Sequence, residues 1–181
     1  MTRVPMTGKP ISLPRHVRAL AALLCGALLL SACSGWQLRG DLHAPRFEAL
    51  SLQGGSARLH YSLERQLAKV GVPLHTEARY VVHISDERLQ DRTAAVDSQG
   101  REAERELTYE ITWQLVDSKT GAVLNPPRHI MSMRSFAYYP DNVTASSDEQ
   151  NLVETDLFDD VTYRLINQLA DASRKIQPQD L

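Results

Sequence analysis

The sequence predicts an α+β fold in which two α-helices pack on one face of a four-stranded, mostly antiparallel sheet, in the order βαβββα. Three observations predict it. Residues 107–115 alternate strictly between apolar and polar, which is typical of a strand with one buried face. Two other segments repeat apolar residues at helical spacing. Short turn signals separate the strand-like segments, so that consecutive strands can pair as a meander.

The first half of the expected domain is a strand followed by a helix. Residues 47–52 are apolar-rich, and Gly54-Gly55-Ser56 ends this short strand. We expect a helix over residues 57–70, because Ser56 can cap its start and Gly71 followed by Pro73 can end it. Its apolar positions are Leu59, Leu63, Leu67 and Val70.

The second half is expected to hold three strands and a long helix. The strands cover residues 80–96, the alternating segment around 107–115 and residues 128–139, with turns at 98–100 and 117–121. A capping box is predicted at the start of the last helix, because Glu149 lies three residues after Ser146 and Gln150 three residues after Ser147. This helix is expected to reach about Ala172, and residues 177–181 to form a frayed tail.

The first 32 residues have the pattern of a targeting segment. Residues 1–18 carry four basic side chains and no acid, an apolar stretch covers residues 19–30, and Leu30-Ser31-Ala32-Cys33 follows. Leu-Ser-Ala-Cys has the form of a bacterial lipobox, in which the cysteine is acylated and the chain is cut before it. We therefore expect residues 1–32 to be a lipoprotein signal peptide, Cys33 to carry lipid, and residues 33–181 to form a single periplasmic domain. The alternative is an ordinary signal peptide that happens to contain a cysteine.

Charge and location exclude a nucleic-acid-binding role. The 181-residue chain has 20 basic and 22 acidic residues, and removal of residues 1–32 leaves 16 basic and 22 acidic residues, a formal charge of −6. A net acidic, exported domain lacks the basic surface that nucleic acids require. Ser34, rather than Asp, follows Cys33, which resembles the outer-membrane sorting pattern of Gram-negative bacteria. The expected location is the cell outer membrane, lipid-anchored on the periplasmic side, because two or more acyl chains anchor stably.

The sequence contains no motif for catalysis, for a metal or for a cofactor. The histidines of the expected domain form no i, i+4 pair on a predicted helix, and neither a phosphate-cradling glycine loop nor a G-x-S-x-G elbow is present. Asp159 and Asp160 are adjacent on a helix and diverge by about 100°, so we expect a solvated face rather than an acid pair. We therefore expect a protein that is not an enzyme; a lipoprotein enzyme acting on envelope polymers is the alternative.

Four arginines bracket the turn at residues 98–100: Arg88, Arg92, Arg101 and Arg105. Even spacing places Arg88 and Arg92 on one face of their strand, and Arg101 and Arg105 on one face of the next. Arg101 and Arg105 have odd numbers, as do the residues of the apolar row from 107 to 115, so we expect them on the same face of the strand. An apolar surface that ends in guanidinium groups suits an amphipathic ligand with acyl chains and phosphate. The alternative is that the four arginines pair with neighbouring acids on an exposed hairpin; these acids are Asp86, Asp91, Asp97, Glu102 and Glu106.

Several short motifs occur in an order that is found in a known family. The chain contains Cys33, Ser34, Gly35, Trp36, Gln37, Leu38 and Arg39, then Tyr109, Leu115, Asp117, Gly121, Leu124 and Arg134-x-Phe136-x-Tyr138, then Asp141, Glu149 and an acidic helix. The first run is similar to a lipidated Cys followed by Gly, an aromatic residue, any residue and Leu-Arg, with one residue inserted. With these motifs the mature chain resembles the LptE family of lipopolysaccharide-assembly lipoproteins.

This resemblance implies a non-catalytic lipoprotein that plugs the outer-membrane β-barrel protein LptD, helps to assemble it and assists lipopolysaccharide insertion into the outer leaflet. LptD, the membrane and lipopolysaccharide as a direct ligand are the implied partners. Family members have been considered to bind lipopolysaccharide through basic residues near the hairpin tip and ahead of the last helix. Here Ser98 and Gln99 occupy the tip, and Arg92 or Arg101 can substitute for the basic residues that the family has there. A pilot lipoprotein of another outer-membrane complex, such as a secretin, is the alternative.

Overall fold

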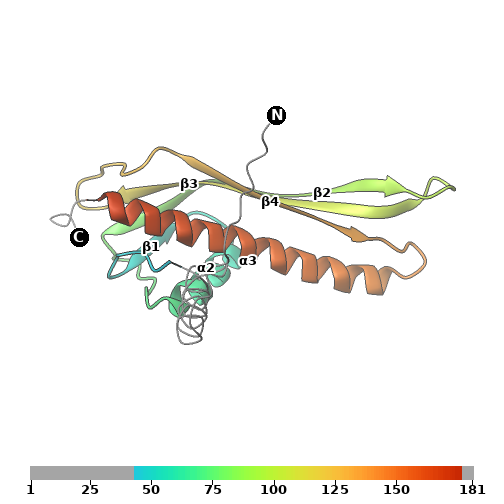
Figure 1. Cartoon of the computed structure of the whole chain (residues 1–181), viewed down its shortest axis with the longest axis horizontal. Coiled ribbons are helices and arrows are strands. Elements are labelled where there is room, and N and C mark those ends of the chain that lie inside the picture. The colour runs from blue at the N-terminus through green and yellow to red at the C-terminus, as the bar shows by residue number, and fades with distance from the viewer. Residues whose placement is uncertain (1–42, 177–181) are drawn as a thin grey trace, which may run out of the picture. The chain divides into compact units, whose positions relative to one another are not determined.

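Four strands form one sheet in the order β1-β2-β3-β4 in the computed structural model, which describes residues 43–176 (Figure 1). The strands are β1 (Leu50–Gln53), β2 (Tyr80–Val96), β3 (Glu102–Asp117) and β4 (Arg128–Ala137). β1 runs parallel to β2, and the other two pairings are antiparallel. The predicted α+β fold and the order βαβββα are confirmed. The sheet is mixed because helix α2 (Ala57–Lys69) carries the chain from the end of β1 back to the edge where β2 starts.

The second helix, α3 (Val143–Lys175), lies with α2 on one face of the sheet and contacts both β3 and β4 (Figure 1). Two adjacent aspartates connect α3 to its neighbours: Asp159 accepts a hydrogen bond from the Ser62 hydroxyl of α2 at 2.8 Å, and Asp160 accepts one from the Ser132 hydroxyl of β4 at 2.6 Å. The carboxylates diverge, as helical geometry predicts. They are partly buried contacts between elements, however, and the expected solvated face is wrong.

Strand β3 supplies the centre of the core. The apolar row that the sequence predicted is at most 1% exposed; it consists of Leu107, Tyr109, Ile111, Trp113 and Leu115. α3 covers this row, where the Tyr109 ring stacks on Phe158 at 4.1 Å and the Trp113 indole donates to Gln168 at 3.1 Å. The alternate residues of β3 are half-buried on the opposite, helix-free face of the sheet.

The start of α2 is fixed by Ser56, as predicted. Its hydroxyl oxygen accepts a hydrogen bond from the Leu59 amide at 3.2 Å, which satisfies one free donor of the first turn. Glu87 of β2 accepts hydrogen bonds from the Ser56 amide and hydroxyl, and also from the Tyr109 hydroxyl at 2.7 Å. Burial and the neighbouring Glu87 carboxylate raise the pKa of Tyr109 far above its ordinary value. This carboxylate therefore joins the helix start to the two central strands.

The start of α3 differs from the prediction. The helix begins at Val143, and the side-chain oxygen of Asn142 accepts from the Ala145 amide at 3.3 Å, so Asn142 is the N-cap. The capping box at Ser146 or Ser147 is wrong, because the buried Ser146 hydroxyl instead accepts a hydrogen bond from the Tyr139 amide at 2.9 Å. Ser146 thus attaches the first turn of α3 to the segment that follows β4.

The turn after β3 is organised by Asp117, whose side chain is 5% exposed. The Arg79 guanidinium donates to one carboxylate oxygen through Nε at 3.0 Å and Nη2 at 2.8 Å, and the Lys119 amide donates to the other at 2.9 Å. The hydrogen bonds from Arg79, and a smaller contribution from the Lys119 amide, hold the pKa of Asp117 below its ordinary value of 3.8. Asp117 therefore connects this turn to the residue before β2.

Gly54 offers a test of the α2 start. Its φ is +79°, and a Cβ there would lie 2.5 Å from the Ile84 carbonyl oxygen. Gly121 has a φ of +70° with nothing within 4 Å of a Cβ, so it is the matched control. We expect Gly121→Ala to cost about 1–2 kcal/mol, from the left-handed backbone alone. Gly54→Ala should cost about 1–3 kcal/mol more, because β2 must shift. Urea denaturation measures both, and equal costs would contradict this account.

Asp117 offers a test of pH dependence. Because its folded pKa is lowered, ionised Asp117 stabilises the fold above its ordinary pKa, and this stabilisation is lost as pH falls through the folded value. We expect Asp117→Asn to lower the thermal midpoint at pH 7, and the gap from the unsubstituted protein to close below about pH 4. Asp148→Asn, an exposed carboxylate of α3, is the control and should show no gap at either pH. A gap that stays constant down to pH 3 would show that Asp117 acts without its charge.

Candidate functional site

The candidate site is the outer half of the β2–β3 hairpin together with the loop that leads into α3. The tip turn is ordered by Asp97, which accepts from the Gln99 amide at 2.8 Å, the Arg101 amide at 3.0 Å and the Arg101 Nε at 2.9 Å. The hydrogen bond from the Arg101 amide contributes most to a pKa of Asp97 below its ordinary value. Gly100, with a φ of +78°, allows the chain to reverse. Arg101 is thus held by its own turn.

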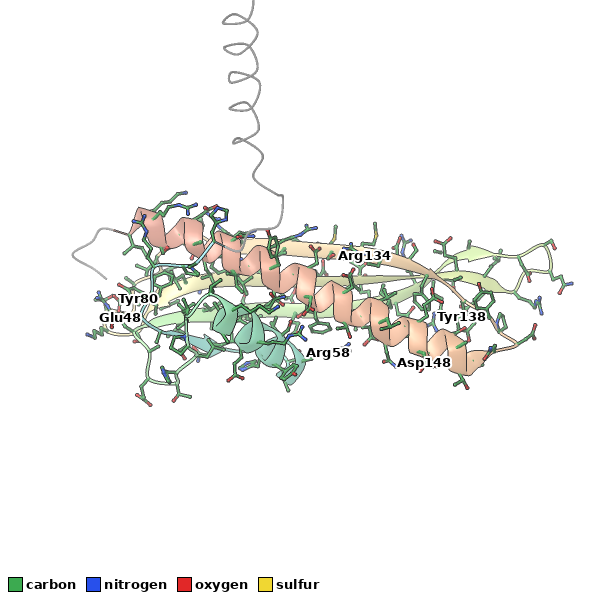
Figure 2. All side chains as sticks on the ribbon, turned by 60° about the horizontal axis from the view of Figure 1, so that its bottom comes forward. Glu48, Arg58, Tyr80, Arg134, Tyr138 and Asp148 are labelled. Carbon is green, nitrogen blue, oxygen red and sulfur yellow. The ribbon has the colours of Figure 1, made fainter. Side chains whose placement is uncertain are left out.

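Arg101 also faces the loop before α3. Its Nη1 lies 3.4 Å from a carboxylate oxygen of Asp141, and the two carboxylates beside Arg101 raise its pKa further above the ordinary value. Between the hairpin and this loop is an open hollow of about 550 Å³. It is lined on one side by residues of the tip and on the other by Tyr138, Tyr139 and Asn142. In Figure 2, Tyr138 lies at this end of the sheet, near the first turns of α3.

Arg105 lies further down β3, on the side of the sheet that carries the helices. Its guanidinium donates to both carboxylate oxygens of Asp91, at 3.1 and 2.7 Å, and lies 5.3 Å from the centre of the Tyr138 ring. The side chain is 27% exposed. A bidentate carboxylate and an aromatic face together hold this guanidinium in one orientation.

Arg88 and Arg92 lie on the opposite, helix-free face. Cross-strand register places Arg88 opposite Glu110 and Arg92 opposite Glu106, and the nitrogen–oxygen distances are 3.5 and 2.6 Å. The structure therefore places Arg88 and Arg92 on one face, as strand spacing predicted, but the thickness of the sheet separates this pair from Arg105. Arg101 is at the tip, and two register shifts in the last residues of β2 lie between it and the regular ladder.

All four arginines are paired with carboxylates, yet three remain about half exposed or more: Arg88 at 54%, Arg92 at 68% and Arg101 at 48%. A guanidinium has five N–H donors, so one carboxylate leaves donors for a second anion. The apolar row of β3 offers no acyl surface, since the helices cover it. The large apolar side chains that are exposed around the hairpin and the loop include Leu89, Val96 and Tyr139.

Other kinds of site are not formed in the described part of the chain. Residues 43–176 contain no group of three or more side chains placed to hold a metal ion. Within the same range, no helix is both long and apolar enough to cross a membrane. The predicted lipid-attachment residue, Cys33, lies outside the described residues. One set of residues that the sequence analysis did not single out, Arg46, Arg79 and Lys119, lines a second hollow at the other end of the sheet.

Comparisons with known proteins identify the family of this fold. A family model described as LptE, lipopolysaccharide-assembly, matches residues 47–169. The fold is similar to that of lipoprotein B from Nitrosomonas europaea, with a TM-score of 0.63 and 20% identity over 78% of this chain and 94% of that one. A minor lipoprotein from Acinetobacter baumannii has a TM-score of 0.58 and 22% identity over 73% and 98% of the two chains.

A third similar structure is the rare lipoprotein B from Shewanella oneidensis, with a TM-score of 0.59 and 21% identity over 70% of this chain and 96% of that one. At these identities the structures support the fold alone. No curated protein sequence matches the chain. The family model spans β1 to most of α3, and thus includes the hairpin and its four arginines.

Proposed function

The chain belongs to the LptE family of lipopolysaccharide-assembly lipoproteins, and from this premise we propose that its domain plugs the outer-membrane β-barrel protein LptD. In this role it helps the barrel to assemble and assists the insertion of lipopolysaccharide into the outer leaflet. The observation that carries the proposal is the family match over residues 47–169, which includes every strand of the sheet. The family is one of assembly lipoproteins associated with the outer membrane, so we propose a binding role without catalysis.

The anchor in this proposal is Cys33. We propose that it becomes the acylated first residue of the mature protein and holds the domain at the periplasmic side of the outer membrane, with residues 33–181 forming one periplasmic domain. A multiply acylated residue keeps a protein on its membrane, whereas one acyl chain does so only marginally. An anchor of this kind raises the local concentration of the domain near any barrel in the same membrane.

The helix-free face of the sheet supports a place inside a barrel. It presents charged and hydroxyl side chains along β2 and β3, and the interiors of large outer-membrane barrels are polar. Two exposed methionines, Met131 and Met133, lie among them on β4. Methionine adapts its shape to a partner, so this face can contact an irregular polar wall without leaving gaps.

Direct contact with lipopolysaccharide is the second part of the proposal. We propose Arg101 and Arg105 as its main phosphate partners, because the hollow of about 550 Å³ beside Arg101 is open and Tyr138 adjoins both residues. Arg88 and Arg92 are the second candidate pair, on the opposite face. The pilot role at a secretin is not favoured by the family membership.

Co-purification tests the plug role. We expect the tagged full-length lipoprotein, extracted from outer membranes in mild detergent, to bring LptD with it, and its depletion to reduce the amount of correctly assembled LptD. Another outer-membrane lipoprotein with the same tag is the control. Recovery of this protein alone, with LptD levels unchanged on depletion, would contradict the proposal, and a secretin in place of LptD would support the alternative.

Lipopolysaccharide titration of the purified full-length protein tests the ligand contact. We expect Arg101→Ala with Arg105→Ala to weaken binding by about tenfold or more, because hydrogen bonds to a charged group are lost. Arg88→Ala with Arg92→Ala reports on the opposite face. The matched control is Arg65→Ala with Arg174→Ala, which removes two ion-paired arginines away from the hairpin. Equal affinity of all three double variants would remove the hairpin arginines from the ligand site.

A further inference from the structure

Basic side chains without an acidic partner are concentrated at one end of the described domain. Ten of the arginines in residues 43–176 lie within 4.0 Å of a carboxylate, mostly along the hairpin and on α3. Within these residues, the basic side chains that form no ion pair are Arg46, Lys69, Lys119, Arg128 and Lys175. They precede β1, end α2, lie in the turn after β3, begin β4 and end α3.

These positions meet at the end of the sheet opposite the hairpin tip. Register aligns Leu50 of β1 with Tyr80 of β2, and Tyr80 with Asp117 of β3. The Arg46 amide donates to the Ser173 hydroxyl at 3.0 Å, which places the start of the described chain against the last turns of α3. Figure 1 shows the end of α3 beside the end of β3, far from the hairpin tip.

Three of the basic residues at this end line a hollow of about 290 Å³: Arg46, Arg79 and Lys119. Asp117 orients two of these residues, because its carboxylate accepts hydrogen bonds from the Arg79 guanidinium and from the Lys119 amide. Arg79 further lies 5.1 Å from the centre of the Tyr80 ring. Among the described residues that line it, Glu48 is the one acidic side chain, so positive side chains outnumber it. Figure 2 shows Glu48 and Tyr80 together at this end, away from Tyr138 and Asp148.

The chemistry of the hollow suits a phosphate group. A guanidinium binds two phosphate oxygens in parallel, and an ammonium adds a point charge. The volume is at the small end of ligand sites, so it accommodates a headgroup rather than acyl chains. Unlike the hairpin arginines, Arg46 and Lys119 have no carboxylate that a phosphate must displace.

The location of this end favours a membrane lipid as the source of the phosphate. His43, the first described residue, donates its amide to Asn167 of α3 at 3.2 Å and follows Cys33 by ten residues, a reach of at most about 35 Å. We propose that the hollow binds the phosphate headgroup of an anionic phospholipid in the leaflet that holds the anchor. This inference rests on the lipid anchor in the proposed function. An anionic leaflet attracts the basic end and repels the rest of a domain with a formal charge of −6, so the two effects orient the domain together.

Photo-crosslinking in cells tests the site on the full-length protein. The photoreactive residue p-benzoylphenylalanine replaces Glu48 at the hollow or, as the matched control, Asp148 at the far end of α3. After irradiation, intact mass spectrometry of the purified protein reports both acylation of Cys33 and the mass of any adduct. We expect a phospholipid adduct at position 48 and none at position 148.

Charge variants complete the test, each made in the protein that carries p-benzoylphenylalanine in place of Glu48. We expect Arg46→Gln with Lys119→Gln to reduce the adduct about tenfold or more, because each basic residue near an anionic surface contributes to binding. Arg46→Lys with Lys119→Arg keeps the charge and should keep the adduct, and equal thermal midpoints show that the fold is intact. An adduct that is absent, insensitive to the Gln variants, equal at position 148 or of lipopolysaccharide mass would overturn the proposal. A phospholipid adduct that persists where LptD does not co-purify would sustain this site while refuting the plug role.

Discussion

Strand β3 has one face for the core and one for the surroundings, and the remaining elements are placed by that difference. The apolar row of alternate residues from Leu107 to Leu115 must be removed from water, and α3 is the element long enough to cover this row along most of the strand. Once α3 occupies that face, α2 can bury its own apolar stripe only beside it. The helix-free face is then free to carry the charges and hydroxyls that a polar partner requires.

The elements that follow from local chemistry could be predicted from the sequence. Ser56 caps α2, and the alternation of β3 gives the buried face, because both depend on neighbours in the chain. The start of α3 could not be predicted in this way. Ser146 has the residue type and spacing of a cap, but its hydroxyl is used by the Tyr139 amide, a contact that exists only when the end of β4 lies beside the helix. Because tertiary packing uses the Ser146 hydroxyl in this way, Asn142 is the N-cap instead.

In the candidate site, too, local spacing predicts some features and tertiary packing determines the others. Strand spacing correctly placed Arg88 and Arg92 on one face, but the carboxylate that each arginine contacts depends on cross-strand register, which the turn and the bulges of β2 determine. The basic hollow had no sequence signal. Arg46, Arg79 and Lys119 are far apart in the chain and are brought together only because β1, β2 and β3 meet at one end of the sheet.

The two groups of basic residues differ in what a phosphate must do to bind them. At the hairpin a phosphate has to replace the carboxylate that is paired with each arginine, such as Asp91 or Asp97. This replacement is favoured only where the phosphate offers more charge or better geometry than a carboxylate. Enclosure in a barrel would strengthen the existing ion pairs as well as the new ones, so enclosure alone does not favour the exchange. At the other end no carboxylate has to leave Arg46 or Lys119. A phosphate at this end therefore meets two basic side chains without an ion pair, whereas a phosphate at the hairpin must first replace a carboxylate.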